Sequence, residues 1–250
     1  MSPKTVIVTG ANCGIGLGLV QQLSKNPDIK IIIATVRDFK NAKDLQAIGD
    51  SRIHILLLEA TSEESVDRFV KEVEEIVGDN GLNLLINNAG TGVKYATKTP
   101  PNRSLLTQQI DINTISVVLL TQKLLPLLIK ASSQTSGPQL STSRSAVIFI
   151  SSGAGSIIDN TTGSGWFDGM AYRLSKAALN QFARTIAVDL KDDKVLSVSF
   201  CPGWVKTRLA GDGALLTVEE ATGRLVESFG KLNEEHNGMF FENDLTLKNF

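Results

Sequence analysis

Short apolar runs rich in β-branched residues alternate along this chain with longer amphipathic stretches. Runs that are nearly continuous in apolar residues are typical of strands buried on both faces of a parallel sheet. The expected strands are Thr5–Thr9, Ile29–Thr35, Ile53–Glu59, Leu82–Asn87, Ala146–Ser151 and Val195–Cys201. The helices expected between them are Ile15–Ser24, Asn41–Ile48, Glu63–Val77, Ser104–Ala131 and Tyr172–Leu190. This alternation predicts successive βαβ units, the building blocks of α/β folds.

Consecutive βαβ units predict the architecture of the whole chain, residues 1–250. Right-handed crossovers would build a doubly wound, mostly parallel sheet with helices on both faces. The tail Asn237–Phe250 carries the pair Phe240 and Phe241 and should add an edge strand, which gives a seven-stranded Rossmann-type sheet in a single domain. The Ser-, Thr- and Gln-rich stretch Ser132–Ser145 should be a solvated loop before the fifth expected strand.

Composition narrows the class of protein. The 25 Lys and Arg residues nearly balance the 26 Asp and Glu residues, so the chain carries no general attraction to nucleic acid or anionic membranes. Cys13 and Cys201 are the only cysteines, which favours a reducing compartment over a disulfide scaffold. The N-terminal residues show no signal-peptide pattern, so we expect a cytoplasmic protein. Neither His54 nor His236 lies in a ligand-spaced cluster, and no metal site is expected.

A glycine-rich turn follows the first expected strand and opens the first expected helix. Its glycines are spaced G-x-x-x-G-x-G, unlike the G-x-G-x-x-G of many dinucleotide-binding folds. Glycines allow a sharp turn and the close approach of a pyrophosphate, and the helix N-terminus offers that anion free N–H groups and a positive dipole end. The turn therefore predicts a dinucleotide site formed by Gly10, Asn12, Cys13, Gly14, Ile15 and Gly16.

Three further motifs follow the glycine-rich turn in a fixed order. They are Asn87-Asn88-Ala89-Gly90, Tyr172-Arg173-Leu174-Ser175-Lys176 and Pro202-Gly203-Trp204-Val205-Lys206-Thr207. With these motifs the chain resembles the short-chain dehydrogenase/reductase family over nearly its full length. Within the family it is most similar to the sniffer-like and C-factor-like carbonyl reductases. The resemblance implies an NADPH-dependent carbonyl reductase that acts on an aldehyde or ketone.

Tyr172 and Lys176 are the expected centre of the chemistry. Four residues apart in a helical pattern, they share one helix face. A nearby ammonium lowers the pKa of a phenol, so we expect Tyr172 to donate a proton to the carbonyl oxygen. By the family pattern Ser152, rather than Ser151, is the catalytic serine that steadies this oxygen. Asn113 matches the family's helix asparagine, whose backbone carbonyl helps hold a water that relays protons to the lysine.

The choice of nicotinamide cofactor depends on the end of the second expected strand. An acid there would accept the ribose hydroxyls of NAD, whereas Arg37 can pair with the 2′-phosphate of NADP. Asp38 complicates this interpretation, and Cys13 stands where many NADP-preferring relatives carry a second basic residue. The resemblance adds the other cofactor-binding residues: Glu59, Ala60, Asn88, Ala89, Gly90, Tyr172, Lys176, Pro202, Gly203, Val205 and Thr207.

Several alternatives stay open at this point. The same residues would serve an alcohol or steroid dehydrogenase that works oxidatively, and a non-catalytic NADP-binding regulator is the non-enzyme alternative. The insertion Ile157–Gly169, with Trp166 and Phe167, is expected to close over the substrate as a lid. The family resemblance also implies a homodimer or homotetramer that pairs through Ser104–Ala131 and Tyr172–Leu190.

Overall fold

The computed structural model describes residues 2–165, 167–210 and 213–250. The described strands form one seven-stranded sheet in the order β3-β2-β1-β4-β5-β6-β7, and every neighbouring pair is parallel. The doubly wound Rossmann-type sheet is therefore confirmed, including the expected edge strand. The strands are β1 (Thr5–Val8), β2 (Ile31–Val36), β3 (Ile53–Leu57), β4 (Leu84–Asn87), β5 (Ala146–Ile150), β6 (Leu196–Cys201) and β7 (Phe240–Glu242).

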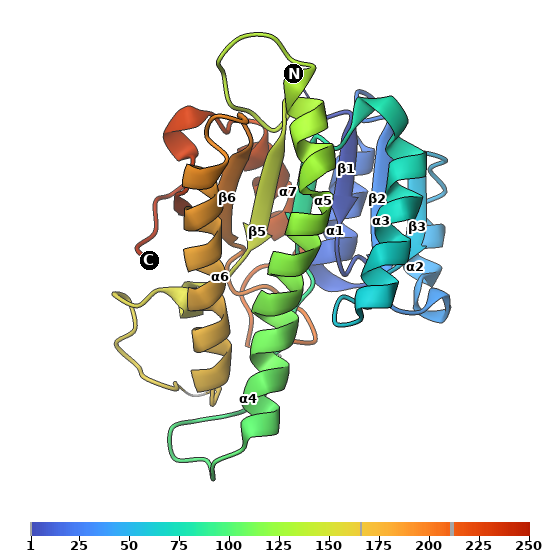
Figure 1. Cartoon of the computed structure of the whole chain (residues 1–250). Helices are drawn as coiled ribbons and strands as arrows, with labels where there is room; N and C mark the ends of the chain where they lie inside the picture. The colour runs from blue at the N-terminus through green and yellow to red at the C-terminus, as the bar shows by residue number, and fades with distance from the viewer. Residues whose placement is uncertain (1, 166, 211–212) are drawn as a thin grey trace.

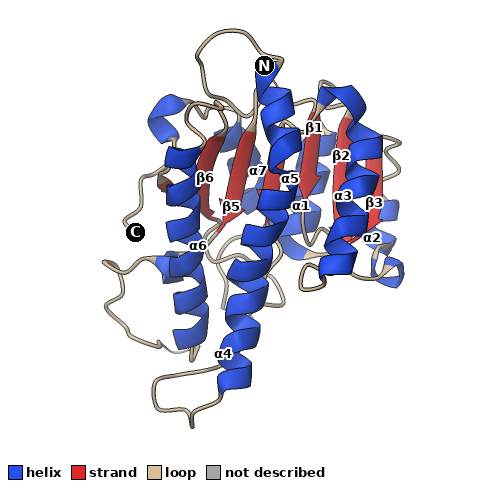
Figure 2. Cartoon of the chain, viewed as in Figure 1, coloured by secondary structure: helices blue, strands red, loops and turns tan. Residues whose placement is uncertain are grey.

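Helices cover both faces of the sheet (Figures 1 and 2). One face carries α1 (Gly14–Ser24), α2 (Lys43–Gln46) and α7 (Val218–Phe229). The opposite face carries α3 (Glu63–Val77), α5 (Ser116–Ser133) and α6 (Met170–Asp189). α4 (Arg103–Ile110) continues the line of α5 beyond the edge of the sheet, as Figure 1 shows.

The strands are apolar on both faces because both faces are covered. In β1, Val6 and Val8 join the core beneath α1 and α7, whereas Ile7 joins the core beneath α3 and α5. All three side chains are fully buried. Each fully buried aliphatic side chain contributes about 1.5–3 kcal/mol relative to an exposed one. The near-continuous apolar runs in the sequence are thus the signature of a two-sided core.

β1 also marks the point where the order of the strands reverses. Val8 pairs with Ala34 of β2 on one side and with Ile86 of β4 on the other. In open α/β sheets a ligand binds outside the carboxyl ends of the strands at such a switch point. This places the expected cofactor site at the ends of β1 and β4.

The long helix expected over Ser104–Ala131 is interrupted in the structure. Between α4 and α5 the chain makes a π-helical turn at Asp111–Ile115. The continuous segment Arg103–Ser133 is the one described helix that is long and apolar enough, by length and composition, to cross a membrane. Its Leu124 and Leu128 are fully buried in the core beneath the sheet, as in the core helix of a globular fold.

Three further expectations need correction. The expected helix Asn41–Ile48 is only a 3-10 turn at Phe39–Asn41 followed by the four-residue α2. α7, which the sequence analysis did not predict, begins with a capping box. The stretch Ser132–Ser145, expected to be a solvated loop, is exposed only in its middle. Arg144 near its end is 1% exposed and donates to backbone carbonyl oxygens within the same stretch.

Candidate active site

Four of the predicted site segments lie at the carboxyl ends of β1, β4, β5 and β6. The glycine-rich turn follows β1, and Asn88–Gly90 follows β4. Ser152 follows β5, and Pro202–Thr207 follows β6. Because these four parallel strands are neighbours in the sheet, their loops come together at one edge. The topology therefore brings segments far apart in sequence into one candidate site.

The glycine-rich turn is held against the loop that follows β4. Gly10 has a φ of 64°, in the left-handed region, and a Cβ there would lie 2.9 Å from the Ala89 Cα. A Cβ on Gly16 would lie 2.6 Å from Asn88 Nδ2. Asn88 Nδ2 donates to the carbonyl oxygen of Thr9 at 2.8 Å. Larger side chains at either glycine would force the two loops apart, so the glycines are required by this contact.

The start of α1 suits an anion. Its N-cap residue, Cys13, makes no side-chain capping hydrogen bond, and the first turn contains no acidic residue. The first N–H groups of a helix have no partner within it, and here they belong to Gly14, Ile15 and Gly16. Thr207 from the β6 loop stands over this turn, since a Cβ on Gly14 would lie 3.2 Å from the Thr207 Cγ2. The residues present therefore fit a pyrophosphate.

Arg37 and Asp38 both follow the end of β2, but their side chains differ in their surroundings. Arg37 directly follows β2 and is exposed. The Asp38 carboxylate accepts a 2.9 Å hydrogen bond from the backbone N–H of Lys40 and caps the 3-10 turn. Asp38 is thus engaged in a local turn, and Arg37 is left at the position where a 2′-phosphate would be expected.

Glu59 has a local role in the structure. Its carboxylate accepts a 2.9 Å hydrogen bond from the Thr61 hydroxyl, and its backbone N–H donates to Ser65 Oγ at 2.9 Å. These bonds tie the end of β3 to the first turn of α3, whose N-cap is Ser62. Ala60, the next residue, is half-buried. Any contact of this pair with the adenine stays a prediction.

Tyr172 and Lys176 share one face of α6, as their spacing predicts. Lys176 Nζ lies 5.7 Å from the centre of the Tyr172 ring and donates to the carbonyl oxygen of Ile150 at 2.8 Å. Lys176 is 5% exposed, and its burial lowers its pKa to about 8. Burial raises the pKa of Tyr172 to about 12, and a hydrogen bond with Ser152 partly opposes this shift. Loss of solvation dominates the Tyr172 pKa in this structure, and the lowering expected from Lys176 stays a prediction.

The two serines after β5 lie in different surroundings. Ser152 lies close enough to the Tyr172 phenol to lower its pKa, and its Oγ accepts a hydrogen bond from the backbone N–H of Ala154 at 3.1 Å. Ser151 is 3% exposed, and its Oγ has no hydrogen-bond partner among the described residues. The structure therefore brings Ser152, and not Ser151, to the phenol.

Asn113 lies in the π-helical turn and is fully buried. Its Oδ1 accepts from the backbone N–H of Thr91 at 2.8 Å, and its Nδ2 donates to Thr91 O and to Ser175 Oγ. A Cβ on Gly90 would lie 3.4 Å from Asn113 Oδ1 and 3.8 Å from Lys176 Nζ. The side chain thus ties the β4 loop to α6 beside the lysine, a role that the sequence analysis did not assign to it.

The β6 loop closes the other side of the site. Gly203 has a φ of 84°, and the carbonyl oxygen of Pro202 accepts a 2.8 Å hydrogen bond from Asn243 Nδ2. Val205 is 2% exposed. Cys201 is buried, and this burial raises its pKa to about 11, so its thiol is a packing group and not a nucleophile. The described residues include no group of three or more His, Cys, Asp or Glu that could hold a metal ion.

The insertion Ile157–Gly169 is tied to the loop after β4. The Tyr95 N–H donates to the Asp168 carbonyl oxygen at 2.7 Å, and the Thr97 N–H donates to Ser164 Oγ at 3.1 Å. Phe167 stacks on the Arg173 guanidinium at 5.4 Å. Trp166, the other aromatic residue of the expected lid, lies outside the described residues. Lid motion of this insertion stays a prediction.

Comparison with known proteins identifies the family. The sequence model of the short-chain dehydrogenases matches residues 4–214. The chain belongs to the short-chain dehydrogenase family. It is 58% identical to the carbonyl reductase designated Sniffer of Caenorhabditis elegans, with both chains covered in full and a TM-score of 0.94. It is 37% identical to the carbonyl reductase Sniffer of Drosophila melanogaster, with 99% of this chain and 100% of that one covered and a TM-score of 0.94.

Two further relatives of this short-chain dehydrogenase are described with a cofactor or a substrate. An NADPH-bound carbonyl reductase from chicken fatty liver is 35% identical, with a TM-score of 0.95, and the alignment covers 100% of this chain and 95% of that one. A benzil reductase of Saccharomyces cerevisiae that forms (S)-benzoin is 31% identical over 92% of this chain and 82% of its own length. The resemblance to the short-chain dehydrogenases and to their sniffer-like group is confirmed.

Arg208 of this short-chain dehydrogenase is a candidate that the sequence analysis missed. Its Nη2 lies 3.9 Å from Cys13 Sγ, and both residues are exposed. The β6 loop therefore places a cation beside position 13, where the second basic residue is absent. The two residues are 195 positions apart, so no local pattern could have indicated their proximity.

Proposed function

We propose that this chain is an NADPH-dependent carbonyl reductase that reduces an aldehyde or ketone. The observation that carries the proposal is the placement of two groups around the Tyr172 phenol: Ser152 interacts with it and lowers its pKa, and Lys176 Nζ lies 5.7 Å from the centre of its ring. The group lies beside the loop after β4, since a Cβ on Gly90 would lie 3.8 Å from Lys176 Nζ. The NADPH-bound carbonyl reductase from chicken liver supports the cofactor, and the yeast benzil reductase supports the class of substrate.

Tyr172 acts as the proton donor in this proposal. With its pKa raised to about 12, the phenol keeps its proton at neutral pH and can give it to a substrate oxygen that gains negative charge. NADPH, when bound, supplies the hydride. Ser152 lies near the same phenol, so a carbonyl oxygen placed beside Tyr172 would also lie within reach of the serine hydroxyl. The two hydroxyls together orient the carbonyl and stabilise the charge on its oxygen.

Lys176 stabilises the phenolate that remains after proton donation. Its bond to the carbonyl of Ile150 holds the ammonium at the end of β5, and a pKa of about 8 leaves it mostly protonated at neutral pH. A positive charge near the ring favours the ionised phenol. Asn113 acts as a positioning residue, because it joins Thr91 to Ser175 on either side of the lysine.

Arg37 and Arg208 are the residues proposed to bind the cofactor's phosphate groups. Arg37 follows the end of β2, and Arg208 reaches Cys13 of the glycine-rich turn from the β6 loop. Arginine recognises phosphate through charge-assisted, frequently bidentate hydrogen bonds. Gly14, Ile15 and Gly16 would bind the pyrophosphate through their backbone N–H groups.

Replacing the proton donor tests the proposal. Tyr172→Phe removes only the phenolic oxygen, so kcat for NADPH-dependent reduction of an active ketone or aldehyde should fall by about 10²–10⁴-fold. NADPH affinity, measured by fluorescence titration, should stay near that of the wild type. Tyr95→Phe is the matched control, because the Tyr95 hydroxyl accepts a hydrogen bond from the backbone N–H of Asn102. Near-wild-type turnover by Tyr172→Phe with normal NADPH binding would contradict the mechanism.

A further inference from the structure

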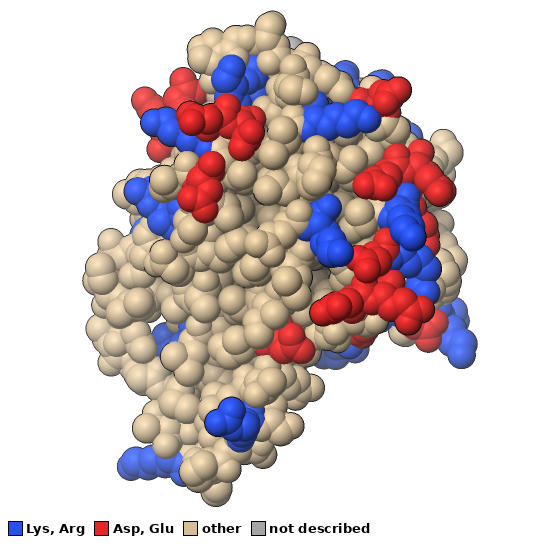
Figure 3. All heavy atoms as spheres, viewed as in Figure 1, with Lys and Arg blue, Asp and Glu red and all other residues tan. Residues whose placement is uncertain are grey.

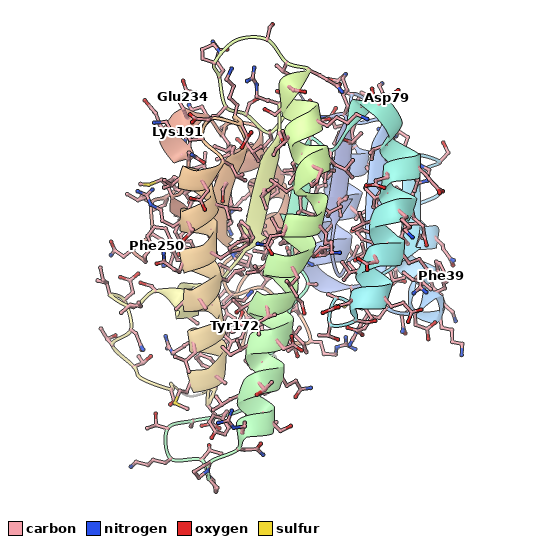
Figure 4. The ribbon with its side chains drawn as sticks, in the orientation of Figure 1. Phe39, Asp79, Tyr172, Lys191, Glu234 and Phe250 are labelled. Carbon is pink, nitrogen blue, oxygen red and sulfur yellow. The ribbon has the colours of Figure 1, made fainter. Side chains whose placement is uncertain are left out.

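The segment that follows β7 turns back toward the catalytic loop. Leu247 forms an antiparallel bridge with Phe241, and the backbone N–H of Lys248 donates to the Phe240 carbonyl oxygen at 2.8 Å. The Phe250 ring packs against the Phe240 ring, with centroids 5.9 Å apart. We call residues 248–250 the clasp. Figure 4 shows Phe250 beside α6, on the side where the insertion 157–169 leaves the sheet.

The clasp is bonded to the chain just beyond the catalytic serine. The Phe250 carbonyl oxygen accepts from the Ile158 N–H at 3.2 Å and from Ser156 Oγ at 3.3 Å. Asn249 Nδ2 donates to Asp159 Oδ1 at 3.1 Å. Three hydrogen bonds therefore fix the segment that runs from the Ser152 turn into the insertion at residue 157.

Lys248 adds an ionic and an apolar contact at the same place. Its Nζ lies 2.8 Å from Glu242 Oε1 and 3.7 Å from Asp159 Oδ2, and its side chain is 18% exposed. A Cβ on Gly153 would lie 3.3 Å from the Lys248 Cε, so the lysine stem covers the residue next to Ser152. Lys248 thus links β7, the Ser152 turn and the start of the insertion.

The Ser152 turn is held from the opposite side by α6. A Cβ on Gly155 would lie 2.9 Å from the backbone carbon of Lys176 and 3.0 Å from Asn180 Nδ2. The 3-10 turn Gly153–Gly155 therefore lies between α6, which carries Tyr172, and the clasp. Releasing the clasp would free this turn to move away from α6, and Ser152 would move with it.

We propose that residues 248–250 position Ser152 against Tyr172 and set the start of the insertion 157–169 at the substrate pocket. This inference rests on the proposed carbonyl reductase function. Lys248 and Asn249 are positioning residues, because they act through the Ser152 turn. The nucleotide cradle belongs to the loops after β1, β2, β4 and β6, whereas the hydrogen bonds and ion pairs of the clasp go to β7 and to residues 156–159. The clasp therefore governs carbonyl turnover and not the affinity for NADPH.

Lys248→Met is the sharpest test, because methionine keeps an apolar stem over Gly153 and loses both ion pairs. We expect kcat/KM for the carbonyl substrate to fall about tenfold, since a small misplacement of a catalytic group is costly. NADPH affinity should not change, and Lys248→Arg should restore kcat/KM. Lys231→Met is the matched control, because it removes an exposed pair with Glu227 at the end of α7.

Asn249→Ala is the second variant, and hydrogen exchange is the second measurement. Both clasp variants should speed amide exchange in residues 153–160 and leave exchange in β1 and α1 unchanged. Unchanged amide exchange in residues 153–160 would overturn the proposal. Wild-type kcat/KM together with faster exchange would also overturn it, because the clasp would then be a purely structural element. A loss of NADPH affinity as large as the fall in kcat/KM would also overturn it.

The exchange experiment does not depend on the reaction. If the wild type reduced no carbonyl compound, the proposed function would fail, and faster exchange at 153–160 would still show that the clasp holds the Ser152 turn. If Tyr172→Phe lost activity as expected and Lys248→Met changed nothing, the clasp alone would be refuted. The two failures can therefore be told apart.

Discussion

The Lys176 ammonium nitrogen lies 5.7 Å from the centre of the Tyr172 ring. Partial loss of solvation raises the pKa of the half-buried tyrosine to about 12, and burial lowers that of the lysine to about 8. At neutral pH each group therefore holds its proton: the phenol is ready to donate, and the ammonium is ready to stabilise the phenolate. Of the two groups, Lys176 is the first to lose its proton as the pH rises.

The pH dependence of turnover should report the charge of Lys176. We expect kcat for carbonyl reduction to be level below about pH 7 and to fall as the pH rises through about 8, where the lysine loses its proton. Lys176→Met should turn over slowly and without this alkaline limb. The measurement is kcat under saturating NADPH across the pH range. An unchanged limb in Lys176→Met would assign the titration to another group.

The two serines after β5 should differ sharply in their effects. Ser152→Ala removes the hydroxyl that interacts with the Tyr172 phenol, and loss of one such donor should lower kcat by about 10²-fold. Ser151→Ala removes a buried hydroxyl without a described hydrogen-bond partner, so kcat should be unchanged. Single-turnover kinetics on both variants would test the placement. A larger loss for Ser151→Ala would show that the other serine steadies the substrate.

Arg37 should discriminate between the two nicotinamide cofactors. Arg37→Asp places an anion where the 2′-phosphate is expected, and removing a charge-assisted hydrogen bond costs about 1.5–3 kcal/mol. NADPH affinity should therefore fall far more than NADH affinity in fluorescence titrations. Equal losses for both cofactors would show that Arg37 does not recognise the 2′-phosphate.

Arg208 should compensate for the cysteine at position 13. Arg208→Ala should weaken NADPH binding, and adding Cys13→Arg in the same chain should restore it, because the two positions lie side by side. Lys206→Ala, which removes another exposed cation of the same loop, is the control. A loss restricted to NADPH would assign Arg208 to the 2′-phosphate, and equal losses with NADH would assign it to the pyrophosphate. No loss with either cofactor would remove Arg208 from the site.

We also propose that the face of α5 and α6 pairs with a second copy of this chain. Ile115 and Leu119 are 44% and 45% exposed, and Leu174 and Val188 on α6 are 53% and 63% exposed. Figure 3 shows few charged side chains over the middle of this face, in contrast to the α3 side. Large exposed apolar side chains on a charge-poor face are typical of a protein interface.

Light scattering tests this pairing. The wild type should be a dimer or tetramer at micromolar concentration, and Leu119→Glu should shift it toward the monomer. Leu215→Glu is the control, because Leu215 is 76% exposed but lies in the loop before α7. A monomeric wild type would contradict the proposal.

Local patterns in the sequence were enough to predict the sheet, the glycine-rich turn and the pairing of Tyr172 with Lys176. These patterns are apolar runs, glycines between a strand and a helix, and a spacing of four in a helix. The capping box at Thr217 and Glu220 was also a local signal, and it could have predicted α7. The ends of the expected strands differed from the observed ones by only one or two residues, as at Ile53–Glu59 against Ile53–Leu57.

The remaining features of the site depend on tertiary contacts. Folding places Arg208 beside Cys13, Ser152 against Tyr172, and Lys248 over Gly153. It also sets the direction of the Tyr172 pKa shift, because burial depends on everything packed around the ring and not on the neighbouring lysine alone. Such contacts join residues far apart in the chain, and they form only when the parallel strands bring their loops to one edge of the sheet.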